Sequence, residues 1–530
     1  MIYFILCLLA WFPYFLLRTK KALHMLQQNL YNRNSRYIKW LVMNRSKVFT
    51  IIDLLPLALA LIFYFLKNHV IITILTVIVY GIAFIRTYDK MKNEQTKLPL
   101  VFTDRIKRII LTTFILYLIP TIIIISYYDI TDLNDYLYIY ILLAYLQYFI
   151  VLLSVVINIP VEKLVYYYYF NKAKRKLNSM PYLKVIGITG SYGKTSSKNI
   201  LNDILSIKYN TLPTPKNYNT PYGLMITANN YLDKFTEILI AEMGAYKKGE
   251  IKELCDFVHP KYGILTKIGK AHLESFGSEE IIQKTKFELI ESLPSDGIGI
   301  LNGDDPLQIN YKLQNNCKIK WIGIDNKDVD VRASNIKSSN EGTTFDVMFK
   351  GDKKKHPFET KLLGYANVYN ILGALALGYE LGITIKELQR AVKRVNPVEH
   401  RLELKKYLDM FIIDDAYNSN PVGSQMAIDV LGTMPGKKIV VTPGMTELGD
   451  IQYDENKKFG VSISKVCDEV ILVGKKQTKP IQDGLKEAKY SSKKIHIVND
   501  VKEALALLPK LKDKDTYILL ENDLPDMFNE

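Results

Sequence analysis

Five long apolar runs crowd into the first 158 residues of this 530-residue chain. They are Ile2–Leu17, Val48–Phe65, Val70–Ile85, Ile109–Tyr127 and Tyr136–Asn158. Each is close to the length that an α-helix needs to cross a hydrocarbon core of about 30 Å. One such run can be the buried helix of a soluble protein, but five in succession with almost no charge inside favour a multi-pass membrane region. The first run has neither a basic start nor a small-residue cleavage site, which favours an anchor over a signal peptide.

The basic residues between the runs indicate which side of the membrane each loop faces. Loops 18–47 and 86–108 and the segment after Asn158 are rich in lysine and arginine, whereas loops 66–69 and 128–135 hold one base between them. Basic loops stay in the cytoplasm. The sequence therefore predicts a cell-membrane protein with its N-terminus outside, five spans and all later residues inside. We attribute most of the net charge of +15 to topology and to membrane lipid as a partner, and expect no nucleic-acid partner.

From Leu183 onward, short β-rich runs alternate with helical stretches. Most predicted strands are apolar throughout, as is typical of strands covered on both faces. They are Lys184–Thr189, Ile238–Glu242, Tyr262–Ile268, Ile298–Asn302, Lys318–Ile324, Phe411–Asp414, Lys438–Thr442, Glu469–Val473, Lys494–Ile497 and Thr516–Leu520. The alternation predicts α/β architecture with parallel sheets.

These patterns together predict four parts in the chain. A membrane region with five transmembrane helices covers residues 1–158, and a basic linker covers 159–182. A P-loop ATPase-like central domain follows over 183–395. A Rossmann-like C-terminal domain completes the chain over 396–530, since Asn396-Pro397 interrupts a helix-like pattern at that point.

The segment Val185–Ser196 has the pattern of a strand, a glycine loop and the start of a helix. Residues Gly190–Thr195 match the end of a phosphate-binding loop, in which backbone N–H groups and a helix N-terminus meet phosphate oxygens. Lys194 can reach the β and γ phosphates of a nucleotide, and the Thr195 hydroxyl can ligate Mg²⁺. One glycine of the usual pattern is replaced by Ile188. The residues predicted to bind ATP here are Gly190, Ser191, Tyr192, Gly193, Lys194, Thr195 and Ser196.

Eight short segments, in chain order, resemble the Mur ligase family of ATP-dependent amide-forming enzymes of cell-wall precursor synthesis. They are Ile188–Ser196, Thr214–Gly223, Ala241–Ala245, Ile268–Ser278, Lys284–Glu288, Leu301–Asp305, Glu399–Arg401 and Asp414–Asn420. The match runs from about Val185 to Leu519. The sequences of Glu242–Ala245 and Asp415–Asn420 are most similar to those of the branch that adds D-alanyl-D-alanine to a UDP-N-acetylmuramoyl tripeptide.

The resemblance implies roles for individual residues. Family members phosphorylate a carboxylate with ATP and let an amine attack the acyl phosphate, so cations must be held around the transferred phosphoryl group. The implied catalytic residues are Lys194, Glu242, His272 and Lys286. The implied ligands of two Mg²⁺ ions are Thr195, Glu242, His272 and Lys286, the last if it is carbamylated. The implied further ATP contacts are Asn302, Arg401, Asp415, Asn418 and Asn420. Taken singly, Lys286 could equally be a solvated helix lysine and His272 a structural histidine.

The chain departs from the family pattern in three places. The five membrane runs stand where typical members have a soluble domain that holds the UDP part of the substrate. Ala366 stands where histidine is usual. In the C-terminal domain, Thr442–Gly449 lacks the usual Asp-Met pair, and Leu520–Asp523 stands where a Lys-Gly-Ser stretch is usual. The amine substrate is therefore left open by the sequence.

We expect an ATP-dependent acid–amino-acid ligase at the cytoplasmic face of the membrane. Its partners would be an amino acid or dipeptide and a peptide-bearing wall precursor, either UDP-linked or lipid-linked. One alternative is a related ligase for another envelope polymer, of the poly-γ-glutamate or pseudomurein type. Another is a nucleotide-binding membrane scaffold without catalysis. A transporter is disfavoured, because the sequence shows no Walker-B pair or signature segment and no ionisable residues that mark a path through the spans.

Overall fold

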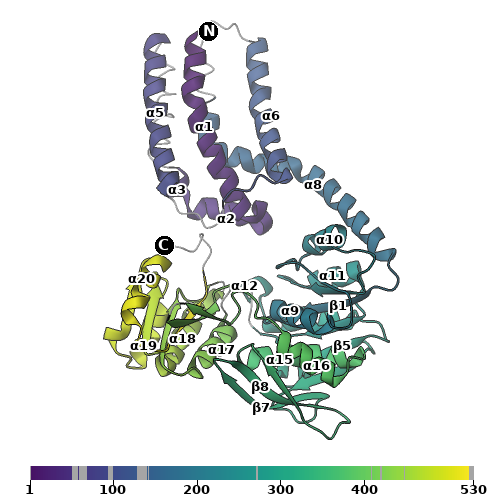
Figure 1. Ribbon diagram of the computed structural model, residues 1–530. Helices are drawn as coiled ribbons and strands as arrows, with labels where there is room; N and C mark the ends of the chain where they lie inside the picture. The colour runs from purple at the N-terminus through teal and green to yellow at the C-terminus, as the bar shows by residue number, and fades with distance from the viewer. Residues whose placement is uncertain are drawn as a thin grey trace. The chain divides into compact units, whose positions relative to one another are not determined.

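The computed structural model describes residues 2–49, 58, 69–93, 99–127, 140, 142–269, 273–407, 409–417, 420–446 and 448–523. These residues form two compact units, Met1–Tyr168 and Tyr169–Glu530. The described part of the first unit is helical, and the second unit contains two β-sheets with helices on their faces (Figure 1).

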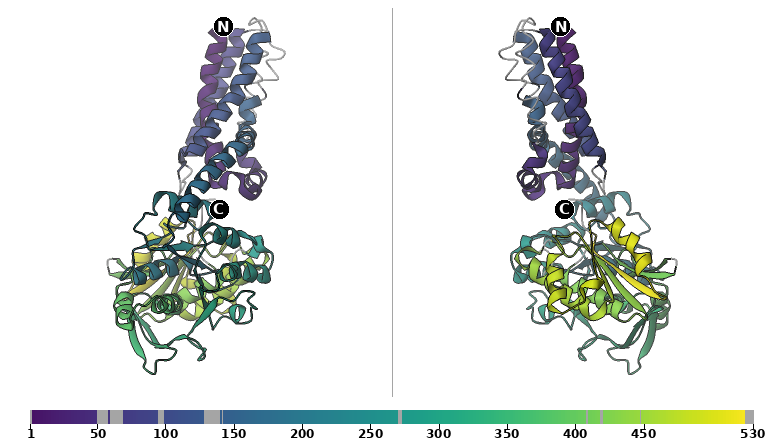
Figure 2. Two further views of the ribbon diagram at one scale, coloured as in Figure 1. Left: turned by 90° about the vertical axis from the view of Figure 1, so that its right-hand side faces the viewer. Right: turned by 90° about the vertical axis from the view of Figure 1, so that its left-hand side faces the viewer.

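Long helices dominate the first unit. In both views of Figure 2, α1, α5 and α6 run alongside one another, coloured purple to blue. Its helices are α1 Ile2–Gln28, η1 Leu30–Ser35, α2 Arg36–Met43, α3 Arg45–Val48, α5 His69–Asn93, α6 Asp104–Tyr127 and α8 Gln147–Asn178, whose last residues enter the second unit. Helices α1, α5 and α6 contain the first, third and fourth apolar runs, and α8 contains the fifth from Gln147 on. The second run, Val48–Phe65, lies almost wholly outside the described residues.

The first unit exposes many large apolar side chains and buries several polar ones beside its apolar core, whereas a soluble helix bundle carries polar residues on its outer face. Gln147 is fully buried, and its amide donates a 2.8 Å hydrogen bond to the Thr19 hydroxyl while its oxygen accepts from Tyr117. The outward faces carry large apolar side chains such as Leu9, Val77 and Phe114. Among the described residues, the helical segments Val70–Lys92 and Gln147–Asn178 are long and apolar enough to cross a membrane, judged by length and composition.

A buried arginine ties the first helix to a distant part of the same unit. Arg18, which is 4% exposed, donates 2.9 Å hydrogen bonds to the carbonyl oxygens of Ala144 and Tyr145. Its guanidinium also lies over the rings of Tyr145 and Tyr148, at 5.9 and 5.3 Å from their centroids. A buried cation needs such partners, because unpaired burial is costly.

The larger sheet of the second unit has nine strands in the order β2-β3-β1-β4-β5-β6-β7-β8-β9. Strands β2 through β7 are parallel, and β8 is antiparallel to both β7 and β9. The strands are β1 Lys184–Thr189, β2 Thr211–Pro213, β3 Ile238–Glu242, β4 Tyr262–Leu265, β5 Ile298–Asn302, β6 Lys318–Gly323, β7 Val331–Ser339, β8 Gly342–Phe349 and β9 His356–Thr360. The predicted α/β architecture is confirmed, but the sheet is mixed rather than parallel at this edge, where β7 alternates more and less buried residues as antiparallel strands commonly do.

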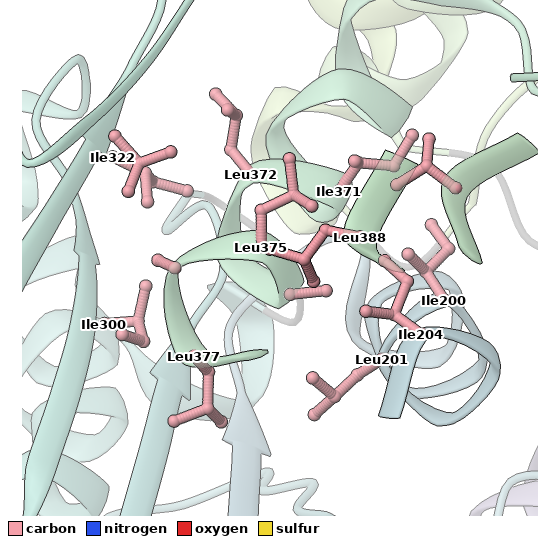
Figure 3. Packing of buried hydrophobic residues seen from close by; sticks show 14 of the residues in the cluster. Ile200, Leu201, Ile204, Ile300, Ile322, Ile371, Leu372, Leu375, Leu377 and Leu388 are labelled. Atoms are coloured by element: carbon pink, nitrogen blue, oxygen red, sulfur yellow. The ribbon is translucent and has the colours of Figure 1, made fainter. Parts of the chain in front are cut away.

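Helices cover both faces of this sheet. On one face, α9 Lys194–Leu205, α15 Gly364–Glu380 and α16 Ile385–Arg394 share a continuous apolar core with the strands, and Figure 3 shows Leu201, Leu375 and Ile300 within it. On the other face, Leu289 of α13 reaches Gly187 of β1. The helices beyond the first group are α10 Pro221–Asn230, α11 Glu250–Val258, α12 Leu273–Phe276, α13 Glu279–Glu291 and α14 Pro306–Ile309.

The smaller sheet has six strands in the order β10-β11-β15-β12-β13-β14, and all its pairings except β10 with β11 are parallel. Helices α17, α18 and α19 pack on one face, and α20 packs on the other. The elements are β10 Glu403–Tyr407, β11 Met410–Asp415, α17 Pro421–Gly432, β12 Lys437–Thr442, η2 Gly449–Ile451, α18 Gln452–Val466, β13 Glu469–Val473, α19 Lys479–Glu487, η3 Ser492–Lys494, β14 Ile495–Val498, α20 Val501–Leu511 and β15 Thr516–Glu521.

The segment expected as a basic linker is largely helical, because α8 continues to Asn178. Its end packs on the second unit. The ring of Phe170 stacks on Phe257 of α11 at 4.7 Å between centroids, and the amide of Asn229 in α10 donates to the carbonyl oxygen of Tyr169 at 3.0 Å. Residues Tyr169–Asn178 are therefore an integral part of the second unit.

Candidate active site

Strands β1 and β3 lie side by side in parallel, with Ile188 opposite Glu242, so the residues that follow β1 meet the end of β3. The loop after β1 needs glycine at two points. Gly190 has φ +151° and Gly193 has φ +80°, which are conformations that side chains with a Cβ rarely adopt. A Cβ at Gly190 would stand 1.9 Å from the Thr266 hydroxyl oxygen, so the loop also has no room for one.

The segment after β4 is hydrogen-bonded to this loop. The Thr266 hydroxyl donates to the carbonyl oxygen of Tyr192 at 2.6 Å. The Ser191 hydroxyl donates to the carbonyl oxygen of Gly269 at 2.8 Å and accepts from the Gly269 amide at 3.0 Å. These bonds hold the loop in a fixed shape without any ligand.

Lys194 is the first residue of α9 and folds back over the loop. Its ammonium donates to the carbonyl oxygens of Gly190 at 2.7 Å and Ser191 at 3.2 Å. Burial lowers the pKa of Lys194 to about 8; Glu242 opposes this shift and Arg401 adds to it. The site thus holds a desolvated cation that gains from the arrival of an anion such as a phosphate group.

Glu242 ends β3 and is 1% exposed. Its Oε1 accepts hydrogen bonds from the Thr195 hydroxyl at 3.2 Å and the Asn219 amide at 3.0 Å. Its Oε2 lies 3.0 Å from the ammonium of Lys198, but among the described residues it receives no contact with hydrogen-bond geometry. A buried carboxylate with spare acceptor capacity beside a hydroxyl fits a hard divalent cation such as Mg²⁺.

Lys286 lies on α13 and is 3% exposed. In the described part of the chain its amine has neither an ion pair nor a hydrogen bond, and the Phe276 ring centroid is 5.6 Å away. Burial, with a contribution from nearby Lys194, lowers the pKa of Lys286 well below its usual value. A lowered pKa increases the share of unprotonated, nucleophilic amine, so this lysine is suited to covalent modification.

Two adjoining cavities collect the predicted site residues. The first, of about 250 Å³, is lined by Gly190, Ser191, Tyr192, Gly193, Lys194, Thr195, Ser196, Glu242, Lys286, Arg401 and Asn420, among others. The second, of about 130 Å³, is lined by Asn302 and Asp415 and shares Tyr192, Gly193, Ser196, Arg401 and Asn420 with the first. His272 and Asn418 lie outside the described residues.

The smaller sheet supplies one wall of these cavities. Arg401 precedes β10, and its guanidinium lies 4.4 Å from the ring centroid of Tyr417. Burial raises the pKa of Asp415 to about 6, against the lowering effect of Arg401. Asn420 caps α17, with its side-chain oxygen accepting from the Gly423 amide at 2.9 Å, so part of its polar capacity serves the helix.

Sequence reasoning missed Lys198 as part of the site. It stands on the buried face of α9 together with Leu201 and Leu205, and a lysine on an apolar face is the signal that could have found it. Asn219 belongs to the recognised Thr214–Gly223 segment but was given no role there. Within the described ranges, no three His, Cys, Asp or Glu side chains come together as a metal cluster. A cation here would therefore rely on Glu242, the Thr195 hydroxyl and oxygens of a ligand.

Two family models match this part of the chain. The Mur ligase middle domain matches residues 188–378, and the Mur ligase, glutamate ligase domain matches residues 400–520. The first model covers the phosphate loop and most of the larger sheet, and the second begins just before Arg401 and covers the smaller sheet.

Three curated UDP-N-acetylmuramoyl-tripeptide–D-alanyl-D-alanine ligases are similar to the chain. The one from Bacillus subtilis (strain 168) is 35% identical over 298 residues, covering 55% of this chain and 63% of the relative. The one from Escherichia coli (strain K12) is 30% identical over 299 residues, covering 55% and 65%. The one from Buchnera aphidicola subsp. Baizongia pistaciae is 31% identical over 335 residues, covering 62% and 69%. The chain thus spans a little under two thirds of the length of the first two relatives.

Two solved MurF structures are similar to this chain in fold. The MurF ligase from Thermotoga maritima in complex with ADP has a TM-score of 0.61 at 26% identity, covering 68% of this chain and 80% of that one. MurF from Acinetobacter baumannii has a TM-score of 0.61 at 25% identity, covering 67% and 77%.

Proposed function

This chain belongs to the Mur ligase family, and we propose that it is an ATP-dependent, ADP-forming acid–amino-acid ligase acting on a cell-wall peptide precursor. The observation that carries the proposal is a single cavity lined by the phosphate loop, Glu242 and Lys286. Such a cavity can hold the γ-phosphoryl group between cationic and metal-binding groups, which is where charge builds up in phosphoryl transfer.

The nucleotide would occupy both cavities. Its phosphates would meet the N-terminus of α9, and Lys194 would exchange its loop carbonyl acceptors for phosphate oxygens. Its nucleoside would enter the second cavity beside Asn302 and Asp415, which line it. The similarity to a MurF ligase solved with ADP supports nucleotide binding by this chain.

Glu242 and Thr195 would hold one Mg²⁺, which neutralises charge on the phosphate oxygens when bound. We place a second ion near Lys286, with His272 as a further ligand. The unprotonated form of the Lys286 amine, favoured by its lowered pKa, would attack the carbon of CO₂, forming an N–C bond as one C=O π bond opens and a proton leaves to solvent. The resulting carbamate would turn a neutral amine into an anionic oxygen donor, a role that fits a buried lysine with no ion pair among the described residues.

The reaction joins a carboxylate to an amine in two steps. A carboxylate oxygen of the acceptor attacks the γ-phosphorus, and the bond to the bridging oxygen of ADP breaks. The amine nitrogen then attacks the acyl carbon. The bond between that carbon and the phosphate oxygen breaks, phosphate leaves with the electron pair, and the nitrogen loses a proton. Lys194 and Arg401 line the cavity where the phosphoryl charge develops, so they would stabilise it.

The amine and the acceptor are the finer part of the proposal. The names of the relatives support D-alanyl-D-alanine as the amine and a UDP-linked tripeptide as the acceptor. To test this, the full-length protein in membranes receives ATP and Mg²⁺ with UDP-linked or lipid-linked acceptors and a panel of amino acids and dipeptides. We expect ADP release to need both substrates, and the product mass to equal acceptor plus amine minus water. ADP release without an amine-dependent product would refute the ligase assignment.

We further propose that the protein is a multi-pass membrane protein with its catalytic part in the cytoplasm. Two apolar helices and the exposed apolar surface of the first unit support membrane insertion, and the basic loops support the orientation. A phosphatase reporter, active only outside the cytoplasm, should be inactive when fused after Glu530. The same reporter fused before Met1 should be active. An active C-terminal fusion would overturn the orientation.

A further inference from the structure

Lys198 places a full positive charge inside the protein, next to the proposed metal carboxylate. It lies one helical turn after Lys194 on α9, so both side chains leave the same face of the helix. Its side chain is 2% exposed and its ammonium lies 3.0 Å from Oε2 of Glu242. The ammonium also donates to the carbonyl oxygen of Lys216, which belongs to the loop between β2 and α10.

That loop is hydrogen-bonded to Glu242 both at its start and at its end. At its start, the Thr214 hydroxyl accepts from the Glu242 backbone amide at 3.1 Å. At its end, the Asn219 amide donates to Glu242 Oε1, and the Asn219 carbonyl accepts from the Gly244 amide at 2.7 Å. Between these points Lys216 has φ +48°, a left-handed conformation that is unfavourable for a residue with a side chain. The Lys198 ammonium donates its hydrogen bond to the carbonyl oxygen of this same residue, Lys216.

The two oxygens of Glu242 therefore have separate partners. Oε2 faces Lys198, and Oε1 faces Thr195 and Asn219. We propose that Lys198 is a positioning residue: it fixes the Glu242 carboxylate and the 214–219 loop so that Oε1 and the Thr195 hydroxyl are aligned for a divalent cation. This inference rests on the proposed function, because it assumes the cation that the ligase reaction needs.

The alternative is that Lys198 only neutralises a buried carboxylate, and the two ideas predict opposite results. If Lys198 only supplied charge, its removal would leave the negative charge of Glu242 uncompensated and so strengthen its attraction for a metal cation. If Lys198 orients the carboxylate, its removal should weaken metal binding, as loss of groups that orient metal ligands commonly does by about 10- to 100-fold.

The experiment measures ADP binding to the full-length protein in detergent by calorimetry, once with EDTA and once with Mg²⁺. The quantity compared is the ratio of the two dissociation constants, which is the gain in affinity due to the metal. For Lys198→Met we expect this gain to fall at least about tenfold, with metal-free ADP binding unchanged. Paramagnetic resonance of free Mn²⁺ should show the same loss of bound ion without any turnover.

A second variant covers the case in which Lys198→Met fails to fold. Lys198→Arg keeps the charge but needs more room in this closed site, so we expect it to displace Glu242 and reduce the metal gain about threefold. Charge neutralisation alone predicts no change for arginine. Leu201→Ala, on the same buried face of α9, controls for lost stability and should keep the wild-type ratio.

The outcomes separate the inference from the function on which it rests. If wild-type protein shows no gain from Mg²⁺, the proposed metal site fails. If wild type shows the gain and Lys198→Met equals or exceeds it, the positioning role is wrong while the ligase proposal stands. An unchanged gain in Lys198→Arg, where the methionine variant is unfolded, overturns the positioning role in the same way.

Discussion

Replacing Lys286 by alanine is expected to lower ligase turnover at least about 100- to 1,000-fold, because the proposed carbamate, which would hold the second ion, could no longer form. ADP binding should stay within about twofold, since the phosphate loop and Glu242 are untouched. Added bicarbonate should not restore the variant. Wild-type protein freed of CO₂ should lose turnover and regain it with bicarbonate. Its dependence on bicarbonate should grow as the pH falls, because protonation removes the nucleophilic amine.

Lys284→Ala is the matched control for this experiment. Lys284 lies two residues earlier on the same helix, is exposed, and pairs with Glu280 at 2.7 Å. Exposed pairs of this kind contribute little, so turnover should equal that of wild type. Mass spectrometry under non-denaturing conditions should find the added mass of CO₂ in wild type and in Lys284→Ala. A Lys286→Ala variant that ligates at the wild-type rate would contradict the carbamate assignment.

Gly190→Ala is expected to weaken ADP binding at least about 100-fold. The added Cβ would meet the Thr266 hydroxyl oxygen at 1.9 Å and the Thr266 backbone carbon at 3.1 Å. Thr266 cannot turn away freely, because its hydroxyl is bonded to the Tyr192 carbonyl. The loop must therefore shift, and its backbone N–H groups would no longer point toward the phosphate oxygens. Calorimetry with Mg²⁺ and ADP on the full-length protein measures the loss.

Gly249→Ala separates backbone strain from steric conflict. Gly249 also has a positive φ, +89°, but a Cβ there would meet nothing within 4 Å. The substitution should cost about 1–2 kcal/mol of stability through strain alone and leave ADP affinity unchanged. If Gly190→Ala binds ADP as tightly as this control, the phosphate-loop assignment is wrong.

The parallel strands were the most predictable part of the fold. Ile238–Glu242 is buried at every position, and its four consecutive apolar residues, Ile238–Ala241, are typical of a strand covered on both faces. The predicted strands are all present, with the largest boundary difference at Tyr262–Leu265, which the prediction extended to Ile268. Strands β2, β7, β8, β9 and β10 were missed: β2 has only three residues, and polar residues are frequent along the other four, as in a solvated loop.

The part of the candidate site that is formed by residues adjacent in the sequence was predictable. Glycine spacing and a following lysine define the loop Gly190–Lys194 without knowledge of the fold. Lys198 and Asn219 could not be assigned in this way, because their roles arise from contacts with Glu242, which is 44 and 23 positions away. The buried state of Lys286 depends on the packing of α13, which composition alone does not reveal.

The bonds of Arg18 bear on the order in which the protein is assembled during translation. Its two carbonyl acceptors lie 126 and 127 positions later in the chain. A nascent chain that has emerged only as far as α6 offers neither of them. The first helix can make these bonds only after the segment before α8 has left the ribosome, so the packing around Arg18 is completed late in the synthesis of the first unit.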